Sequence, residues 1–97
     1  MTEIIALGIA SDVDYTIERL ARLAGGEALD RYVGSRYLFS PDRTVTALLF
    51  ETVHLANRIL GIVGLSSDPE IRRLRSEALG RLERLQDARY ALTGMAR

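Results

Sequence analysis

The sequence predicts an all-α fold, a compact bundle of four to five helices in a single domain that spans residues 1–97. Apolar residues recur every three or four positions through each long segment, which is the spacing of one helix face. Glycines and helix-capping residues separate these segments. The chain is 47% apolar and 27% charged, and these proportions are typical of a folded globular protein with its own core.

The most apolar stretch, residues 40–65, is expected to form the helix around which the others pack. Ser40 can cap a helix, Pro41 suits the first helical position, and Asp42 places negative charge at the positive end of the helix dipole. A helix that is apolar on most sides is normally a buried one, so we expect a buried central helix over about residues 41–63. Its apolar positions include Val45, Leu48, Leu49, Phe50, Val53, Leu55, Ile59, Leu60 and Val63.

The same stretch is long enough to cross a bilayer, but polar side chains interrupt it. Glu51, His54 and Arg58 lie near its middle, and each charge would cost about 2.5–3.5 kcal/mol on insertion scales, more than the leucines return. The short apolar run at residues 4–10 does not resemble a signal peptide, because Glu3 stands where basic residues are expected. We therefore expect a soluble, cytoplasmic protein with no membrane partner.

Two segments precede the central helix. Residues 2–24 indicate either one bent helix or two short helices joined near Ser11, and the Gly25-Gly26 pair ends them. Residues 27–33 favour a short helix. However, residues 31–38 form a nearly mirrored pair of Arg-Tyr sequences around Gly34-Ser35, which suits a short β-hairpin with a type II′ turn. Both interpretations of residues 31–38 remain open.

The last helix is expected from about Asp68 to Thr93, after a capping box formed by Ser67 and Glu70. At 1.5 Å per residue it would be roughly 37 Å long, which is longer than a small domain needs to cover its core. Its apolar stripe repeats close to every seven residues, so it also predicts self-association. The stripe consists of Ile71, Leu74, Ala78, Leu82, Leu85, Ala88 and Leu92.

The residue types leave little material for catalysis. There is no cysteine, no lysine and a single histidine, so the only imidazole base is His54. No phosphate-binding loop or dinucleotide fingerprint occurs, and we expect neither enzymatic activity nor a cofactor. Glu51-x-x-His54 has the spacing of half a di-iron carboxylate site, which a symmetric dimer could complete, with Glu18 as a further ligand. A dimeric metal-binding bundle is therefore a third hypothesis for function.

All thirteen basic residues are arginines, and they are unevenly placed. Residues 1–68 hold six arginines and nine acids, a net charge of −3, whereas residues 69–97 hold seven arginines and four acids, a net charge of +3. Guanidinium groups bind phosphates and aromatic rings stack on bases, so arginine beside tyrosine indicates binding of single-stranded nucleic acid or a guide RNA–DNA hybrid. The candidate nucleic-acid-binding residues are Arg72, Arg73, Arg75, Arg31, Arg36, Tyr32 and Tyr37.

The run Asp14-Tyr15-Thr16-Ile17-Glu18-Arg19-Leu20-Ala21, followed by residues 27–36, resembles the small α-helical subunit of archaeal CRISPR surveillance complexes of the Cascade type. The likeness consists of an aromatic-Thr-x-acid-Arg-Leu run, a glycine break, and a helix that carries acids and arginines. The resemblance implies a non-catalytic subunit in antiviral defence, which stacks with other protein subunits and supports a nucleic-acid strand through basic residues. The alternative is a self-associating or partner-binding helical protein without nucleic acid.

Overall fold

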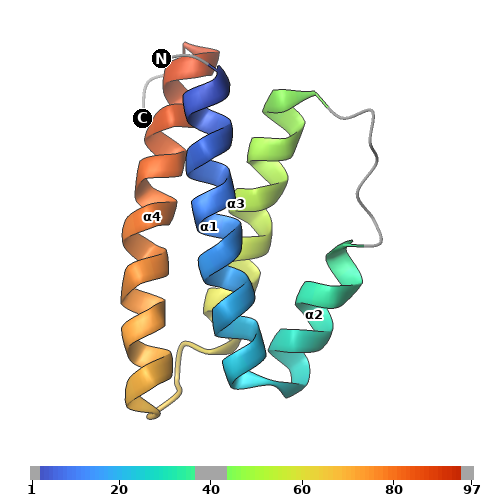
Figure 1. Cartoon of the computed structure of the whole chain (residues 1–97), viewed down its shortest axis with the longest axis vertical. Coiled ribbons are helices and arrows are strands. Elements are labelled where there is room, and N and C mark those ends of the chain that lie inside the picture. Colours follow the sequence, from blue (N-terminus) through green and yellow to red (C-terminus); the bar gives the residue numbers. More distant parts are fainter. Residues whose placement is uncertain (1–2, 37–43, 95–97) are drawn as a thin grey trace.

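The computed structural model describes residues 3–36 and 44–94. This part of the chain is all-α, contains four helices and no strand, and so confirms the predicted helical bundle. In Figure 1, α1, α3 and α4 stand side by side, with α4 running opposite to the other two, and α2 leans against α1 and α3. The helices are α1 (Glu3–Ala24), α2 (Gly26–Arg36), α3 (Val45–Ile62) and α4 (Pro69–Thr93).

Helix α1 runs for 22 residues with no interruption at Ser11, so the expectation of two short helices is wrong. Thr16 is fully buried, and its Oγ1 donates to the carbonyl of Asp12 at 2.9 Å, which satisfies the hydroxyl inside the core. The helix ends where the Gly25 N–H donates to the carbonyl of Ala21, because Gly25 adopts a φ of +67° that favours glycine.

Helix α4 packs along α1 and α3, and the apolar stripe predicted for the last helix lies in the shared core. Ala78, Leu85 and Ala88 are fully buried. The stripe is covered within one chain, so it is not available as a seam for self-association. The cap differs from the predicted Ser67–Glu70 box, because the Asp68 side chain accepts from the backbone N–H groups of Glu70 at 2.8 Å and Ile71 at 3.3 Å.

Helix α3 begins at Val45, with Thr44 as its N-cap. The predicted start at residues 40–42 lies outside the described residues. Leu49 and Ile59 are fully buried, whereas Phe50 on the other side of the helix is 55% exposed. The described part of α3 is therefore amphipathic, and α1 and α3 share the central position, since each contacts all three other helices.

By length and composition, α3 could span a membrane, as could the core helix of many soluble proteins. In this structure, 39% of its residues are buried inside the bundle. The side of α3 that faces away from the core carries His54, Asn57 and Arg58, all of which are exposed.

Helix α2 is attached to the side of the bundle. Residues 31–36 are helical, so the hairpin alternative does not hold for them, and Tyr37 and Leu38 lie outside the described residues. Ala28 and Tyr32 are the buried side chains of α2, one turn apart on the face toward the core. The Tyr32 hydroxyl donates to both carboxylate oxygens of Asp14, at 3.2 and 3.3 Å. Helix α2 contacts α1 and α3 but not α4, which leaves a groove beside α3.

Candidate functional site

The three arginines predicted at the start of the last helix lie on one surface. Arg72, Arg73 and Arg75 line a shallow recess together with Pro69 and Ser76, on the first two turns of α4. The local sequence explains this arrangement, because residues three apart on a helix are neighbours. We refer to these five residues as the α4 recess.

Within the α4 recess, Arg73 is held by acidic neighbours on the same helix. Its Nη2 donates to the Glu70 carboxylate, and its Nη1 lies 3.6 Å from Oε2 of Glu77. The hydrogen bond from Arg73 lowers the pKa of Glu70 below its ordinary 4.5, and the same bond raises the pKa of Arg73. Side chains of both Glu70 and Arg73 are more than half exposed, so a competing anion can replace this pairing at little cost.

The other two arginines of the recess differ in their attachments. Arg75 is partly buried, and its Nη1 donates to the carbonyl of Gly64, so it ties the link between α3 and α4 onto α4. Arg72 is exposed and has no ion pair or hydrogen-bond partner for its side chain among the described residues. The recess thus offers the unpaired guanidinium of Arg72 and that of Arg73, whose ion pair with Glu70 can be exchanged for another anion. The guanidinium of Arg75 has a structural role.

The arginines and tyrosines predicted on residues 31–37 do not join the α4 recess. Because α2 and α4 make no contact, the two sets lie on separate parts of the bundle. The prediction that Tyr32 stacks on a base is wrong, since its ring is only 3% exposed and its hydroxyl donates to Asp14. Arg36 is the last residue of α2, its side chain is not among the described ones, and Tyr37 lies outside the described residues.

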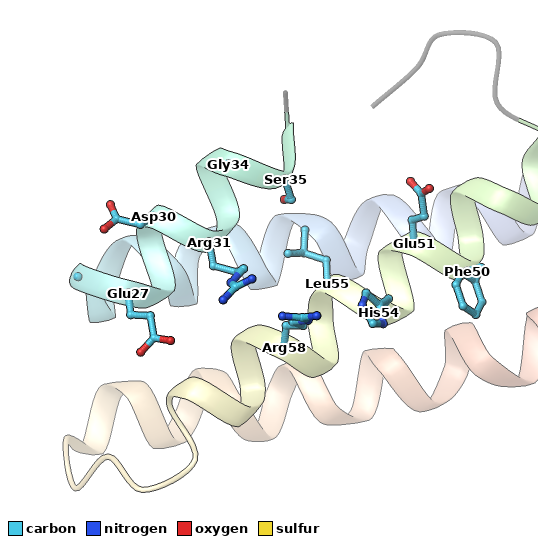
Figure 2. Close-up of a pocket in the computed structure, with 11 residues that line it drawn as sticks. Glu27, Asp30, Arg31, Gly34, Ser35, Phe50, Glu51, His54, Leu55 and Arg58 are labelled. Atoms are coloured by element: carbon cyan, nitrogen blue, oxygen red, sulfur yellow. The ribbon is translucent and has the colours of Figure 1, made fainter. Parts of the chain in front are cut away.

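Arg31 lines a larger hollow between α2 and α3, with a volume of about 970 Å³, which we refer to as the α2–α3 groove. Leu55 lies in its floor and is 7% exposed. Figure 2 shows that Arg31 of α2 and Arg58 of α3 point toward one another across the groove. Neither guanidinium has an ion-pair partner among the described residues. No sequence pattern indicated that these two side chains would face one another, because their relative position depends on where α2 packs.

An exposed aromatic group lies on the α3 side of the groove. The Phe50 ring stacks on the ring of His54, one turn along α3, with centroids 6.2 Å apart and planes 7° apart. The guanidinium of Arg89 on α4 lies 5.6 Å from the centre of the Phe50 ring and 5.2 Å from that of Tyr90. Cation–π contacts of this kind contribute about 0.5–1 kcal/mol at exposed sites. They favour the observed orientation of the Phe50 ring at the edge of the groove.

The structure also places the residues of the metal hypothesis. Glu51 and His54 both line the α2–α3 groove, but no group of three or more potential metal ligands occurs in the described part of the chain. The cations that line the same groove, Arg31 and Arg58, oppose a bound metal ion electrostatically. Among the described residues, Glu51 and His54 alone therefore do not make up a metal site.

Comparisons of the chain with protein-family models, curated proteins and solved structures found no match. The functional argument therefore rests on the two arginine-bearing surfaces of this chain. All three arginines of the α4 recess were predicted as binding residues. The α2–α3 groove, in contrast, combines the predicted Arg31 with Arg58, which was not predicted as a binding residue.

Proposed function

We propose that this protein is a non-catalytic helical subunit of a larger nucleoprotein assembly, and that it contacts nucleic acid through the α4 recess. The observation that supports this proposal is the gathering of Arg72, Arg73 and Arg75 on one surface. On the resemblance in sequence, the assembly is a CRISPR-type antiviral complex that contains other protein subunits and a guide RNA.

The side chains of the recess, more than its backbone, would make the contact. The Asp68 cap already accepts from the first backbone N–H groups of α4, so these donors are occupied. Arg72 is unpaired among the described residues, and Arg73 can exchange Glu70 for a phosphate, because exposed ion pairs contribute only about 0–1 kcal/mol. A bidentate guanidinium–phosphate contact is stronger than a neutral hydrogen bond.

The charge of the whole chain sets the expected affinity. Thirteen arginines balance thirteen acids, so the formal net charge is zero, whereas isolated nucleic-acid-binding domains are usually basic. We therefore expect weak binding by one chain and useful binding when neighbouring subunits align several recesses along one strand. The surface of α4 supplies the contact, and the assembly supplies the avidity.

The proposal is tested by the salt dependence of strand binding. Fluorescence anisotropy with a labelled single-stranded RNA is measured for the natural protein and for Arg72→Gln over a range of salt concentrations. Each phosphate contact on a single strand contributes about 0.7 to the slope of log K against log salt, so Arg72→Gln should reduce that slope by about 0.7.

Arg84→Gln is the matched control. Arg84 is exposed on the same helix, lies outside the recess, and loses the same charge on substitution. Its slope should stay close to that of the natural protein. Equal slopes for the Arg72 and Arg84 variants would show that the recess does not hold the strand.

A protein partner is the second element of the proposal. The α4 stripe is in the core, so self-association through it is not proposed. Large apolar side chains are exposed at Ile4 (81%) and Leu65 (100%), among others. Single exposed apolar residues are normal on protein surfaces, so their exposure alone does not indicate a docking site.

A further inference from the structure

We propose that the α2–α3 groove is a binding site for a small amphipathic molecule, which carries an oxyanion headgroup, carboxylate or phosphate, on an apolar body. This site goes beyond the proposed function. It lies apart from the α4 recess, because α2 and α4 do not touch, and it does not require that the protein bind nucleic acid.

The headgroup is inferred from the two arginines of the groove. Arg31 and Arg58 come from different helices, point toward one another in Figure 2, and have no carboxylate partner among the described residues. An oxyanion held between two such guanidinium groups would accept forked N–H donors from both sides. In the same view the carboxylates of Asp30 and Glu51 point away from the space between the arginines.

The apolar body is inferred from the floor and walls of the groove. Most of the apolar surface comes from the Phe50 ring, which is 55% exposed and lines the α3 side, and Leu55, which is 7% exposed, adds a small apolar area. On the α2 side, Gly34 leaves the backbone bare, and a Cβ placed there would meet nothing within 4 Å. An inorganic anion would contact the arginines and leave these surfaces in water.

The size of the groove fits a small molecule. Its volume of about 970 Å³ is near the upper end of the range of about 300–1,000 Å³ for ligand pockets. Among the described residues, Ala28, Tyr32 and the Tyr32–Asp14 hydrogen bonds fix α2 to the bundle, and the groove lies between α2 and the neighbouring face of α3. It is therefore part of the fold and would be present before a ligand arrives.

The test is to titrate the full chain with small-molecule probes and to measure binding by isothermal titration calorimetry and by shifts of the amide NMR signals. The probes are decanoate and decyl phosphate, which join a headgroup to an apolar body, decanol, which lacks the charge, and inorganic phosphate, which lacks the body. We expect saturable binding of decanoate, decyl phosphate or both, with the largest shifts on α2 and α3. Decanol and inorganic phosphate should bind at least about tenfold more weakly, since each loses one half of the contact.

Three variants locate the binding. Arg58→Gln and Arg31→Gln should each weaken it by roughly tenfold or more, because each removes charged donors. Gly34→Leu should also weaken it, although it removes no charge, because the new side chain would project from a bare part of the wall into the groove. Arg84→Gln, an equal loss of charge on α4, should leave the affinity unchanged. Circular dichroism checks that each variant is folded.

The two headgroup arms identify the source of the ligand. Tighter binding of decanoate indicates a carboxylate, and tighter binding of decyl phosphate indicates a phosphate ester. Decanol that binds as tightly as both would overturn the proposal, as would inorganic phosphate that matches them. NMR shifts confined to other helices, or an affinity unaffected by both Arg58→Gln and Gly34→Leu, would equally exclude this groove. The strand-binding experiment on Arg72 can fail or succeed without changing any of these outcomes.

Discussion

Replacing Tyr32 by phenylalanine should loosen α2 while the rest of the bundle stays folded. The ring of Tyr32 is 3% exposed, and its hydroxyl donates to the Asp14 carboxylate on α1. With Ala28 it forms the buried face of α2, and α2 makes no contact with α4. Phenylalanine preserves the packing of the ring and removes the hydroxyl, with its hydrogen bonds to Asp14.

The size of the effect follows from the geometry. A hydrogen bond to a charged acceptor contributes about 1.5–3 kcal/mol to stability. Here a single hydrogen is shared between two oxygens at 3.2 and 3.3 Å, beyond the usual O–H···O range, so we expect a contribution at or below the lower limit of that range, about 1–1.5 kcal/mol. Tyr32→Ala would also lose the buried ring, a change that costs about 3–5 kcal/mol in a core.

Native-state hydrogen exchange measures the effect helix by helix. In Tyr32→Phe, amides of α2 around Leu29 should exchange roughly five to ten times faster, because 1.4 kcal/mol corresponds to a factor of ten. Amides of α4 around Leu85 should exchange at the rate of the natural protein. Equal acceleration in both helices would show that α2 opens only with the whole bundle. An unchanged rate in α2 would show that the hydroxyl does not hold the helix.

Three further outcomes are expected. Gly80→Ala should raise the free energy of unfolding by about 1 kcal/mol, because Gly80 lies within α4 and a Cβ there meets nothing within 4 Å. Gly25→Ala should lower the free energy of unfolding, because Gly25 has a φ of +67°. Urea denaturation in which both variants shift the midpoint in the same direction would contradict this. Leu85→Ala should lower the free energy of unfolding by about 2–5 kcal/mol, because Leu85 is fully buried. A loss below about 1 kcal/mol in the same assay would place Leu85 outside the core. Arg73→Gln should raise the pKa of Glu70 toward 4.5, as followed by carboxyl NMR. Because the pKa of Glu70 is lower in the folded state, its ionised carboxylate stabilises the fold at pH values above the unfolded pKa, and this stabilisation is lost as the pH falls through the folded pKa. Arg73→Gln should therefore make the free energy of unfolding depend less on pH in this acidic range. A pKa of Glu70 that does not move would show that Arg73 does not bind Glu70 in solution.

The local features of the fold were predictable because neighbouring residues decide them. Gly25 and Gly94 end their helices with a positive φ, as a residue without a Cβ allows. The spacing of the α4 stripe placed Leu82 and Leu85 in the core. The stripe could not reveal what covers it, since a seam between chains and a seam between helices of one chain need the same spacing.

The burial of single aromatic residues was harder to predict. Phe50 was expected within a helix enclosed on most sides, yet it is 55% exposed and held by His54 and Arg89. Tyr32 was predicted as a candidate for contact with nucleic acid, yet it is buried, and Asp14 from another helix accepts from its hydroxyl. Both outcomes depend on partners far away in the sequence, and a single helix period contains no information about them.

The two facing arginines of the groove show more clearly that the pattern along one helix does not predict contacts between helices. Arg31 was predicted as a binding residue through its tyrosine neighbour, whereas Arg58 was noted only as a charge that interrupts an apolar stretch. Their meeting depends on the angle at which α2 packs on α3, which the Tyr32–Asp14 contact helps to fix. Sequence patterns identify the residues on each helix, but the site arises from the packing between helices.

The charges of the α4 recess come from guanidinium groups alone, and the 97 residues contain no side-chain amine. A guanidinium stays protonated at every pH at which proteins function, so the positive charge of this surface is permanent. Acetylating enzymes and amine-directed cross-linkers, which neutralise lysine, have no side-chain target on it. Glu70, the carboxylate that accepts from Arg73, changes the net charge of this surface when acid protonates it, and the hydrogen bond from Arg73 lowers the pKa at which this happens.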